Sequence, residues 1–160
     1  MNKQRICIVG DGLAGLMTAV VLGRIPGVDI NLIAKKEKKN SDKRTTAISH
    51  SNFKFIQEHI VRLDNNLFWP SKNIELFYEI SKEKINFLNL KESHSNLMYV
   101  FENDKIKSIL LKEISKNKIK IIRKDVKSLK DLKNYDLVIL CLGTKSNIYE
   151  NITKLKPIKK

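Results

Sequence analysis

The sequence predicts an α/β fold in which a Rossmann-like parallel sheet is interrupted by an inserted antiparallel excursion. Two observations predict it. A short apolar run at residues 6–9 leads through a glycine-rich turn into a segment of helical periodicity, and a second apolar run follows at 29–34. This is the order of a β-α-β unit. After residue 70 apolar and polar residues alternate as in antiparallel strands, before helical and apolar-strand patterns return.

The β-α-β unit opens the chain. Residues 6–9 (ICIV) are apolar and mostly β-branched, as in a central strand of a parallel sheet. Apolar side chains then recur every three or four positions from Leu13 to Val21, which predicts a helix that Pro26-Gly27 ends. Residues 29–34 are the second predicted strand, and the lysine-rich residues 35–43 are a predicted loop.

The middle of the chain carries weaker signals. Ser51 is expected to cap a helix with Phe53, Ile56 and Ile60 on one face. Trp69-Pro70 is expected to mark a break. Three strands are predicted beyond it, at residues 74–78, 85–90 and 97–101, and they form the antiparallel excursion.

The last third returns to the parallel core. Asn103 or Asp104 is expected to cap a helix, and strands are predicted at 119–122 and 137–142. The second of these is fully apolar and is therefore expected to be central. The predicted organisation is a parallel-sheet domain at 1–70 and 102–150, an antiparallel substrate-domain insert at 71–101, and a basic tail at 151–160.

Charge and composition narrow the function classes. The 160 residues carry 31 basic and 17 acidic side chains, a formal net charge of +14. The basic residues are mostly lysines spread along the chain, without the arginine clusters and interleaved aromatic residues of nucleic-acid readers. We therefore expect a solvated lysine-rich surface and no nucleic-acid partner, with contact to an anionic membrane surface as the alternative.

Cysteine and histidine usage predicts neither a disulfide nor a metal site. Cys7 and Cys141 each stand in an apolar run, which favours buried free thiols in a reducing compartment. The histidines are scattered without metal-ligand spacing. The apolar N-terminal stretch is interrupted by glycines and Asp11, so we interpret it as a phosphate-binding turn rather than a targeting segment and expect a cytoplasmic protein without a transmembrane span.

The turn after the first strand fits the pattern G-x-G-x-x-G. Gly10 is expected to make the tight turn, Gly12 to let the backbone approach a pyrophosphate, and Gly15 to let helix and strand pack closely. Leu13 and Ala14 open the helix, whose free N–H groups and positive dipole end suit an anion. The sequence thus predicts dinucleotide binding, with a ligand-free structural turn as the alternative.

One part of this fingerprint is missing. An acidic residue is expected at the end of the second strand to bind a ribose hydroxyl, but Ala34 and Lys35 stand there. Either Glu37 substitutes from the loop, or the backbone and water bind the ribose. Asp11, inside the turn, is interpreted as neutral for binding, with its side chain pointing outward.

Four segments, 6–15, 41–49, 101–103 and 135–146, resemble the group A flavin hydroxylases, and within them the ubiquinone-biosynthesis ring hydroxylases of the 2-octaprenyl-6-methoxyphenol hydroxylase type. The resemblance implies that the Rossmann-like sheet binds FAD, with Arg44 near its phosphates and flavin and Thr45 beside it. Gly143 falls on a second fingerprint, in which Leu142 replaces the usual aspartate, so Leu142 is expected only to pack.

The resemblance also implies an activity, the hydroxylation of an aromatic ring in ubiquinone biosynthesis. It implies a prenylated phenol as substrate, NAD(P)H as electron donor and a location peripheral to the inner membrane. No catalytic residue can be assigned from the sequence. Because the resemblance covers only the first part of the family, we expect a truncated chain. The alternatives are a non-catalytic or split-gene FAD-binding fragment that needs a partner chain, and an NAD(P)-dependent dehydrogenase module.

Overall fold

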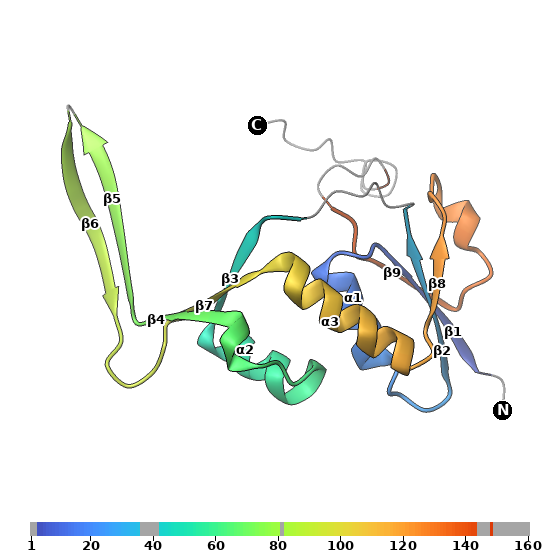
Figure 1. Cartoon of the computed structure of the whole chain (residues 1–160). Coiled ribbons are helices and arrows are strands. Elements are labelled where there is room, and N and C mark those ends of the chain that lie inside the picture. The colour runs from blue at the N-terminus through green and yellow to red at the C-terminus, as the bar shows by residue number, and fades with distance from the viewer. Residues whose placement is uncertain (1–2, 36–41, 81, 144–147, 149–160) are drawn as a thin grey trace. The chain divides into compact units, whose positions relative to one another are not determined.

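The computed structural model describes residues 3–35, 42–80, 82–143 and 148 (Figure 1). The chain divides into two compact units, one made of residues 1–41 and 107–160 and the other of residues 42–106. Each unit is described by itself. The domain boundaries expected from the sequence, at 70 and 102, stay a prediction.

The first unit is built on a parallel sheet. Its strands are β1 (Gln4–Val9), β2 (Val28–Ala34), β8 (Lys120–Arg123) and β9 (Leu137–Leu140), in the order β8-β2-β1-β9. All three neighbouring pairs are parallel. The helix α1 (Leu13–Leu22) connects β1 to β2. The predicted Rossmann-like parallel sheet is confirmed.

The core of this unit fixes the turn between β1 and α1. Cys7 and Ile8 of β1 are fully buried, as are Leu16 and Val20 of α1 and Leu32 of β2. Burying one such aliphatic side chain stabilises the fold by about 1.5–3 kcal/mol. The core therefore fixes the strand before the six-residue glycine pattern and the helix after it. Together they position the backbone of the turn.

The second unit contains a three-stranded antiparallel sheet in the order β3-β7-β4, with β3 at Thr45–Ser49, β4 at Phe68–Ser71 and β7 at Met98–Glu102. Between β3 and β4 lie α2 (His50–Phe55), the π-helical turn η1 (Ile56–Ile60) and the 3-10 turn η2 (Asn65–Leu67). Aromatic rings pack beside the sheet: Phe53 stacks on Tyr99 at 3.9 Å between centroids and meets Phe68 edge-on at 4.9 Å.

A separate hairpin, β5 (Asn73–Ile80) with β6 (Glu83–Lys91), extends the antiparallel excursion (Figure 1). Directly paired residues share a face, and one face is apolar: it carries the pairs Ile74/Leu90, Leu76/Leu88 and Tyr78/Ile85 and also Ile80. Phe87, at the bulge, contacts Tyr78. These side chains, which we call the hairpin face, are largely exposed. The predicted antiparallel excursion is confirmed, whereas its role as a substrate-domain insert stays a prediction.

The chain leaves the antiparallel strands through α3 (Asn103–Lys116). Its residues Ile106, Leu110 and Ile114 follow one another at four-residue spacing and are fully or almost fully buried, as on the core-facing side of an amphipathic helix. Beyond β8, the 3-10 turn η3 (Leu129–Leu132) is closed by a capping box between Ser128 and Asp131. It leads into β9.

Three local predictions are wrong. The helix α2 is capped by Ser49, whose hydroxyl accepts from the N–H of Asn52 at 3.3 Å, and not by Ser51. Pro70 belongs to β4 instead of breaking the chain, because β4 is an edge strand and an edge position tolerates a residue without an N–H. The apolar strand at 137–140 lies at an edge of the described sheet and not in its centre.

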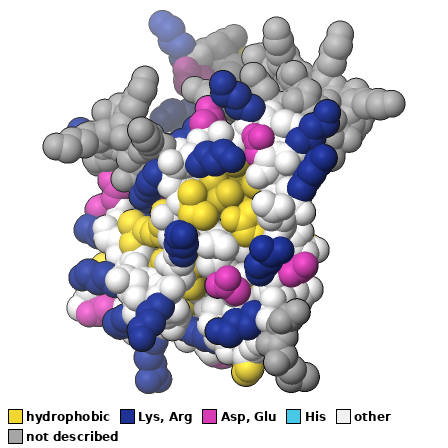
Figure 2. Space-filling view, turned by 90° about the vertical axis from the view of Figure 1, so that its right-hand side faces the viewer, with side chains coloured by type: hydrophobic (Ala, Val, Ile, Leu, Met, Phe, Trp, Pro, Cys, Tyr) yellow, Lys and Arg dark blue, Asp and Glu magenta, His cyan; other side chains and the backbone are white. Residues whose placement is uncertain are grey.

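The surface agrees with a dispersed positive charge. On the face shown in Figure 2, Lys and Arg side chains are scattered among Asp and Glu, around a hydrophobic patch. Within the described ranges, no helix has the length and apolar character needed to cross a bilayer. The predicted basic tail at 151–160 lies outside the described residues.

Candidate dinucleotide-binding site

The carboxyl ends of the four parallel strands meet at one edge of the sheet. The backbone continues its hydrogen bonding just past that edge: Gly10 N–H donates to Ile33 O at 2.8 Å, Cys141 N–H to Val9 O at 2.8 Å, and Lys124 N–H to Ala34 O at 2.9 Å. The segments that follow β1, β2, β8 and β9 are thereby held side by side. Ligands of open parallel sheets bind at this edge.

The three glycines of the turn have different surroundings. Gly10 has φ +116°, and a Cβ there would come within 2.2 Å of Cys141 O. A Cβ on Gly15 would come within 2.0 Å of Gly10 O, so this glycine lets α1 pack against the turn. Gly12 precedes α1, and a Cβ there would have no heavy atom within 4 Å. The first and third glycines are thus required by the fold, whereas the middle one leaves open space.

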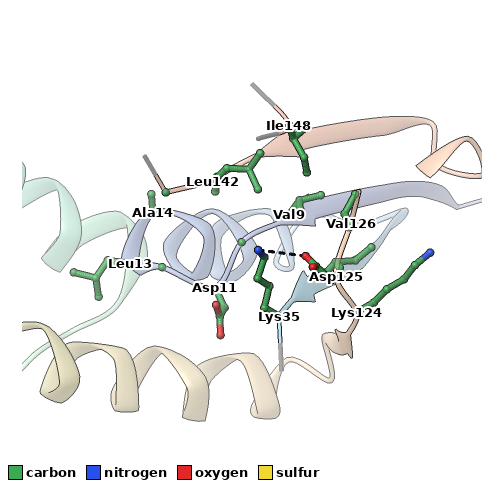
Figure 3. A pocket seen from close by; sticks show the side chains of 15 residues that line it. Val9, Asp11, Leu13, Ala14, Lys35, Lys124, Asp125, Val126, Leu142 and Ile148 are labelled. Carbon is green, nitrogen blue, oxygen red and sulfur yellow. Dashed lines mark ion pairs between the residues drawn. The ribbon is translucent and has the colours of Figure 1, made fainter. Parts of the chain in front are cut away.

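A cavity of about 470 Å³ opens in front of this turn (Figure 3). Five residues predicted to bind a cofactor line it: Gly10, Gly12, Leu13, Ala14 and Gly143. They come from the turn after β1, the first turn of α1 and the segment after β9. The structure therefore brings together residues that are about 130 positions apart in the sequence.

The cavity is apolar on one side and open to an anion on the other. Val9, Ile33, Val126 and Ile148 are buried core residues that also line it, and Leu142 packs against them. The first N–H groups of α1 have no partner within the helix and face this region with the positive end of the helix dipole. The arrangement suits a ligand that joins a flat apolar ring to a phosphate.

Asp11, which also lines the cavity, is paired with two cations. Its Oδ2 lies 3.1 Å from Nη1 of Arg123 and 3.7 Å from Nζ of Lys107. The same Arg123 Nη1 donates to Lys35 O at 3.2 Å. The negative charge inside the turn is therefore balanced by side chains from β8 and α3, which the sequence interpretation did not identify.

A second ion pair lies at the end of β2. Nζ of Lys35 is 3.4 Å from Oδ1 of Asp125, and both residues line the cavity. Figure 3 shows the two side chains meeting there, with Lys124 beside them. This is the place at which the dinucleotide fingerprint expects an acidic residue from β2.

The remaining predicted site residues lie elsewhere. Gly15 is buried behind the turn, and Glu37 lies outside the described residues. Arg44 and Thr45 belong to the second unit, where Thr45 begins β3. Arg44 donates to both carboxylate oxygens of Asp42 at 2.6 Å, and its guanidinium holds the pKa of that carboxyl well below its usual range. The cofactor-binding roles of all nine residues stay predictions.

Sequence reasoning missed the residues that β8 contributes. Lys124, Asp125 and Val126 line the cavity because β8 runs parallel to β2, so that Arg123 pairs with Ala34 at the same edge. The signal was available: a strand was predicted at 119–122, and the carboxyl ends of parallel strands share one edge. The residue following such a strand is a candidate for any site at that edge.

The free thiol of Cys141 lines the cavity, and no metal centre accompanies it in the part of the chain that the structure describes. No group of three or more His, Cys, Asp or Glu side chains is placed to hold a metal ion there. Cys7 and Cys141 are free thiols, and Cys7 is buried as expected, whereas Cys141, which follows β9, is only partly buried. Burial raises the pKa of Cys7 to about 11, so this thiol stays protonated.

The parallel sheet, the glycine turn and the cavity in front of the helix N-terminus define a dinucleotide-binding domain of the Rossmann type. The chain belongs to the family described as FAD binding domain, whose sequence profile matches residues 3–134. A search of curated protein sequences finds no match.

Solved structures with a similar fold include FqzB and two oxygenases. FqzB matches with a TM-score of 0.64 at 16% identity over 98% of this chain and 40% of its own. The tetrameric 2-methyl-3-hydroxypyridine-5-carboxylic acid oxygenase has a TM-score of 0.59 at 15% identity, covering 77% of this chain and 32% of its own. The p-nitrophenol 4-monooxygenase PnpA from Pseudomonas putida DLL-E4 has a TM-score of 0.57 at 14% identity, covering 77% of this chain and 32% of its own. This chain therefore spans well under half the length of each.

Proposed function

We propose that this chain is the FAD-binding part of a flavin-dependent monooxygenase that hydroxylates an aromatic ring. The observation that carries the proposal is the glycine turn at the N-terminus of α1, which faces an apolar cavity at the carboxyl edge of the parallel sheet. Membership of the FAD-binding-domain family supports FAD as the ligand of that cavity.

The residues of the cavity fit such a cofactor. The open space at Gly12 lets a pyrophosphate approach the backbone, where the N–H groups of the first turn of α1 donate to it. Val126 and Ile148 give the cavity an apolar lining that suits an adenine ring, and Gly143 also lines it. Bound FAD supplies the redox chemistry, while the chain's own residues bind it, orient it and exclude water.

The finer assignment rests on resemblance. We propose NAD(P)H as the electron donor and a prenylated phenol of ubiquinone biosynthesis as the substrate, on the likeness of segments 41–49 and 135–146 to the ubiquinone-biosynthesis hydroxylases. Two similar folds carry aromatic-ring oxygenation in their names, a hydroxypyridine oxygenase and a nitrophenol monooxygenase. A cytoplasmic protein peripheral to the inner membrane agrees with this substrate class, and cosedimentation with anionic vesicles tests the membrane contact.

We propose further that a partner chain with the remaining elements of such a hydroxylase covers the hairpin face. The support is the exposed set of large apolar side chains on β5 and β6. In addition, this chain spans only 32% of the similar hydroxypyridine oxygenase and 32% of the similar nitrophenol monooxygenase. Such apolar surface is seldom left open to water. The competing proposal is a non-catalytic fragment, and coexpression with a chain that encodes the remainder separates the two by the appearance of NAD(P)H oxidation.

The visible absorbance spectrum of the purified chain, before and after adding FAD, tests the proposal. Flavin absorbance that corresponds to about one FAD per chain, or a shift in the absorbance spectrum of added FAD, supports the FAD site. A colourless protein that leaves the spectrum of added FAD unchanged contradicts it. Substrate-dependent NAD(P)H oxidation in the presence of the partner chain then tests the monooxygenase assignment.

One observation favours a second candidate, an NADP-dependent dehydrogenase module. Lys35 stands at the end of β2 in place of an acidic residue, and a basic side chain there suits the 2′-phosphate of NADP. Tighter binding of NADP than of FAD in direct competition would support this candidate.

A further inference from the structure

We propose that Asp125 binds the ribose hydroxyls of the adenosine half of the cofactor, in place of the acidic residue that the end of β2 lacks, and that Lys35 orients its carboxylate. The inference rests on the proposed function in one respect, namely that an adenosine dinucleotide occupies the cavity. It adds the residue that recognises the ribose, which neither the glycine pattern nor the family profile assigns.

The position of Asp125 follows from the pairing of β2 with β8. Ala34, the last residue of β2, is in register with Arg123, and Lys124 N–H donates to Ala34 O at 2.9 Å. The chain continuing from β8 is thus fixed against the end of β2. Asp125 follows directly, and its Oδ1 lies 3.4 Å from Nζ of Lys35. A carboxylate is therefore present beside the end of β2, although it comes from another strand.

The chemistry of this carboxylate suits a diol. The side chains of Lys35 and Asp125 are 74% and 55% exposed, so the carboxylate has accessible oxygen for hydroxyl donors. An ion pair this exposed contributes only about 0–1 kcal/mol to folding. Its effect is to restrict the direction of the carboxylate rather than to stabilise the fold. Both residues line the cavity, as a ribose-binding group must.

Of the acidic residues that line the described cavity, Asp125 is the one beside the end of β2. Asp11, the other acidic residue lining it, pairs with Arg123 and Lys107 on the side of the glycine turn. Lys124 is the further cation lining the cavity. A carboxylate that accepts from the 2′-hydroxyl repels a 2′-phosphate at the same place. The inference therefore predicts preference for FAD and ADP over 2′-phosphorylated nucleotides, opposite to the dehydrogenase candidate.

The experiment measures binding of three probes, ADP, 2′-deoxy-ADP and adenosine 2′,5′-bisphosphate, to the full chain by calorimetry. The wild type is expected to bind ADP about tenfold more tightly than 2′-deoxy-ADP, the effect of one hydrogen bond to a charged group. Asp125→Ala is expected to remove this preference. Asp125→Asn, which removes the charge and keeps the shape, is expected to raise affinity for the bisphosphate.

Matched controls separate recognition from folding. Asp29→Asn changes the same residue type at the amino end of β2, where the side chain is exposed and does not line the cavity, and should leave every ratio unchanged. Lys35→Gln should reduce the preference for ADP over 2′-deoxy-ADP, because the carboxylate loses its orienting partner. Thermal unfolding of each variant confirms that the fold is intact.

The outcomes distinguish the two levels of the proposal. If the wild type binds neither FAD nor ADP, the proposed function is overturned, and the ribose assignment with it. If ADP binds but Asp125→Ala keeps the wild-type preference over 2′-deoxy-ADP, the ribose assignment alone is overturned. If Lys35→Gln has no effect on that preference, Lys35 does not orient the carboxylate.

Discussion

The carboxylate of Asp11 lies 3.1 Å from the guanidinium of Arg123, which joins the glycine turn after β1 to the end of β8. Asp11 occupies the variable position between the first two glycines, next to the place where a pyrophosphate would bind. An unpaired carboxylate there would repel that anion. Pairing with Arg123, and with Lys107 at 3.7 Å, lets an acidic residue stand in a phosphate-binding turn.

This pairing predicts the behaviour of Arg123→Gln. The substitution leaves Asp11 with a weaker counter-charge, so FAD affinity should fall by roughly tenfold, about 1.4 kcal/mol. Adding Asp11→Asn to the same chain should restore most of the loss, because the repelling charge is then gone. Fluorescence titration of FAD measures both. Arg24→Gln, in the turn after α1, is the control, and a double variant as weak as Arg123→Gln would contradict the explanation.

Alanine substitution should separate the first two glycines of the turn. Gly10→Ala forces a Cβ to within 2.2 Å of Cys141 O at φ +116°, so it should destabilise the fold by more than about 3 kcal/mol. Gly12→Ala meets nothing within 4 Å and should leave the unfolding temperature nearly unchanged. It should nevertheless lower FAD affinity, because its Cβ enters the space left for the pyrophosphate. Thermal unfolding and FAD titration together test this, and equal destabilisation by both variants would count against the assignment.

The buried thiol of Cys7 should make stability fall at high pH. Burial raises its pKa from 9.0 to about 11, so the folded chain holds its proton over a range in which the unfolded chain has lost it. The stability that the protonated Cys7 thiol gives the folded chain is fully present below pH 9 and is lost as the pH rises toward 11. The free energy of unfolding should fall by up to roughly 3 kcal/mol over this range. Chemical denaturation of the wild type and of Cys7→Ala at pH 8 and pH 10.5 measures it. The variant should lose less stability between the two values, and an equal loss would exclude Cys7 as the cause.

Arg44 gives a test of the role implied by the family resemblance. Its guanidinium is 80% exposed at the side chain and forms a bidentate pair with Asp42. If Arg44 binds the FAD phosphates, Arg44→Ala should weaken FAD binding by roughly tenfold, with a steeper loss at low salt. Asp42→Asn should strengthen binding, because it releases the guanidinium. Lys43→Ala is the neighbouring control. An equal loss of FAD affinity in that variant would show that the effect comes from the overall positive charge and not from Arg44 itself.

Hydrogen exchange should distinguish the β5-β6 hairpin from the parallel sheet. The hairpin is a two-stranded sheet with exposed apolar side chains, and such sheets are only marginally stable in water. Its amides should therefore exchange much faster than those of β1 and β2, whose side chains form the core. A partner chain that covers the hairpin face should slow this exchange. Slow exchange in the isolated chain would contradict the description of an uncovered hairpin.

The β-α-β unit, the glycine turn and the change to antiparallel strands could all be predicted from the sequence. These features are local: apolar periodicity specifies strand or helix over a few residues, and the spacing of Gly10, Gly12 and Gly15 meets the steric needs of one turn. For the same reason the sequence indicated a dinucleotide site and its first residues.

Which distant residues complete the site depends on the tertiary structure. Asp125 and Val126 reach the cavity because β8 pairs with β2 in parallel, and Arg123 reaches Asp11 through the same pairing. The edge position of β9, whose composition predicted a central strand, likewise depends on which strands pair. Strand pairing is set by long-range packing and backbone hydrogen bonds between segments about 90 or more residues apart, and no local pattern encodes it.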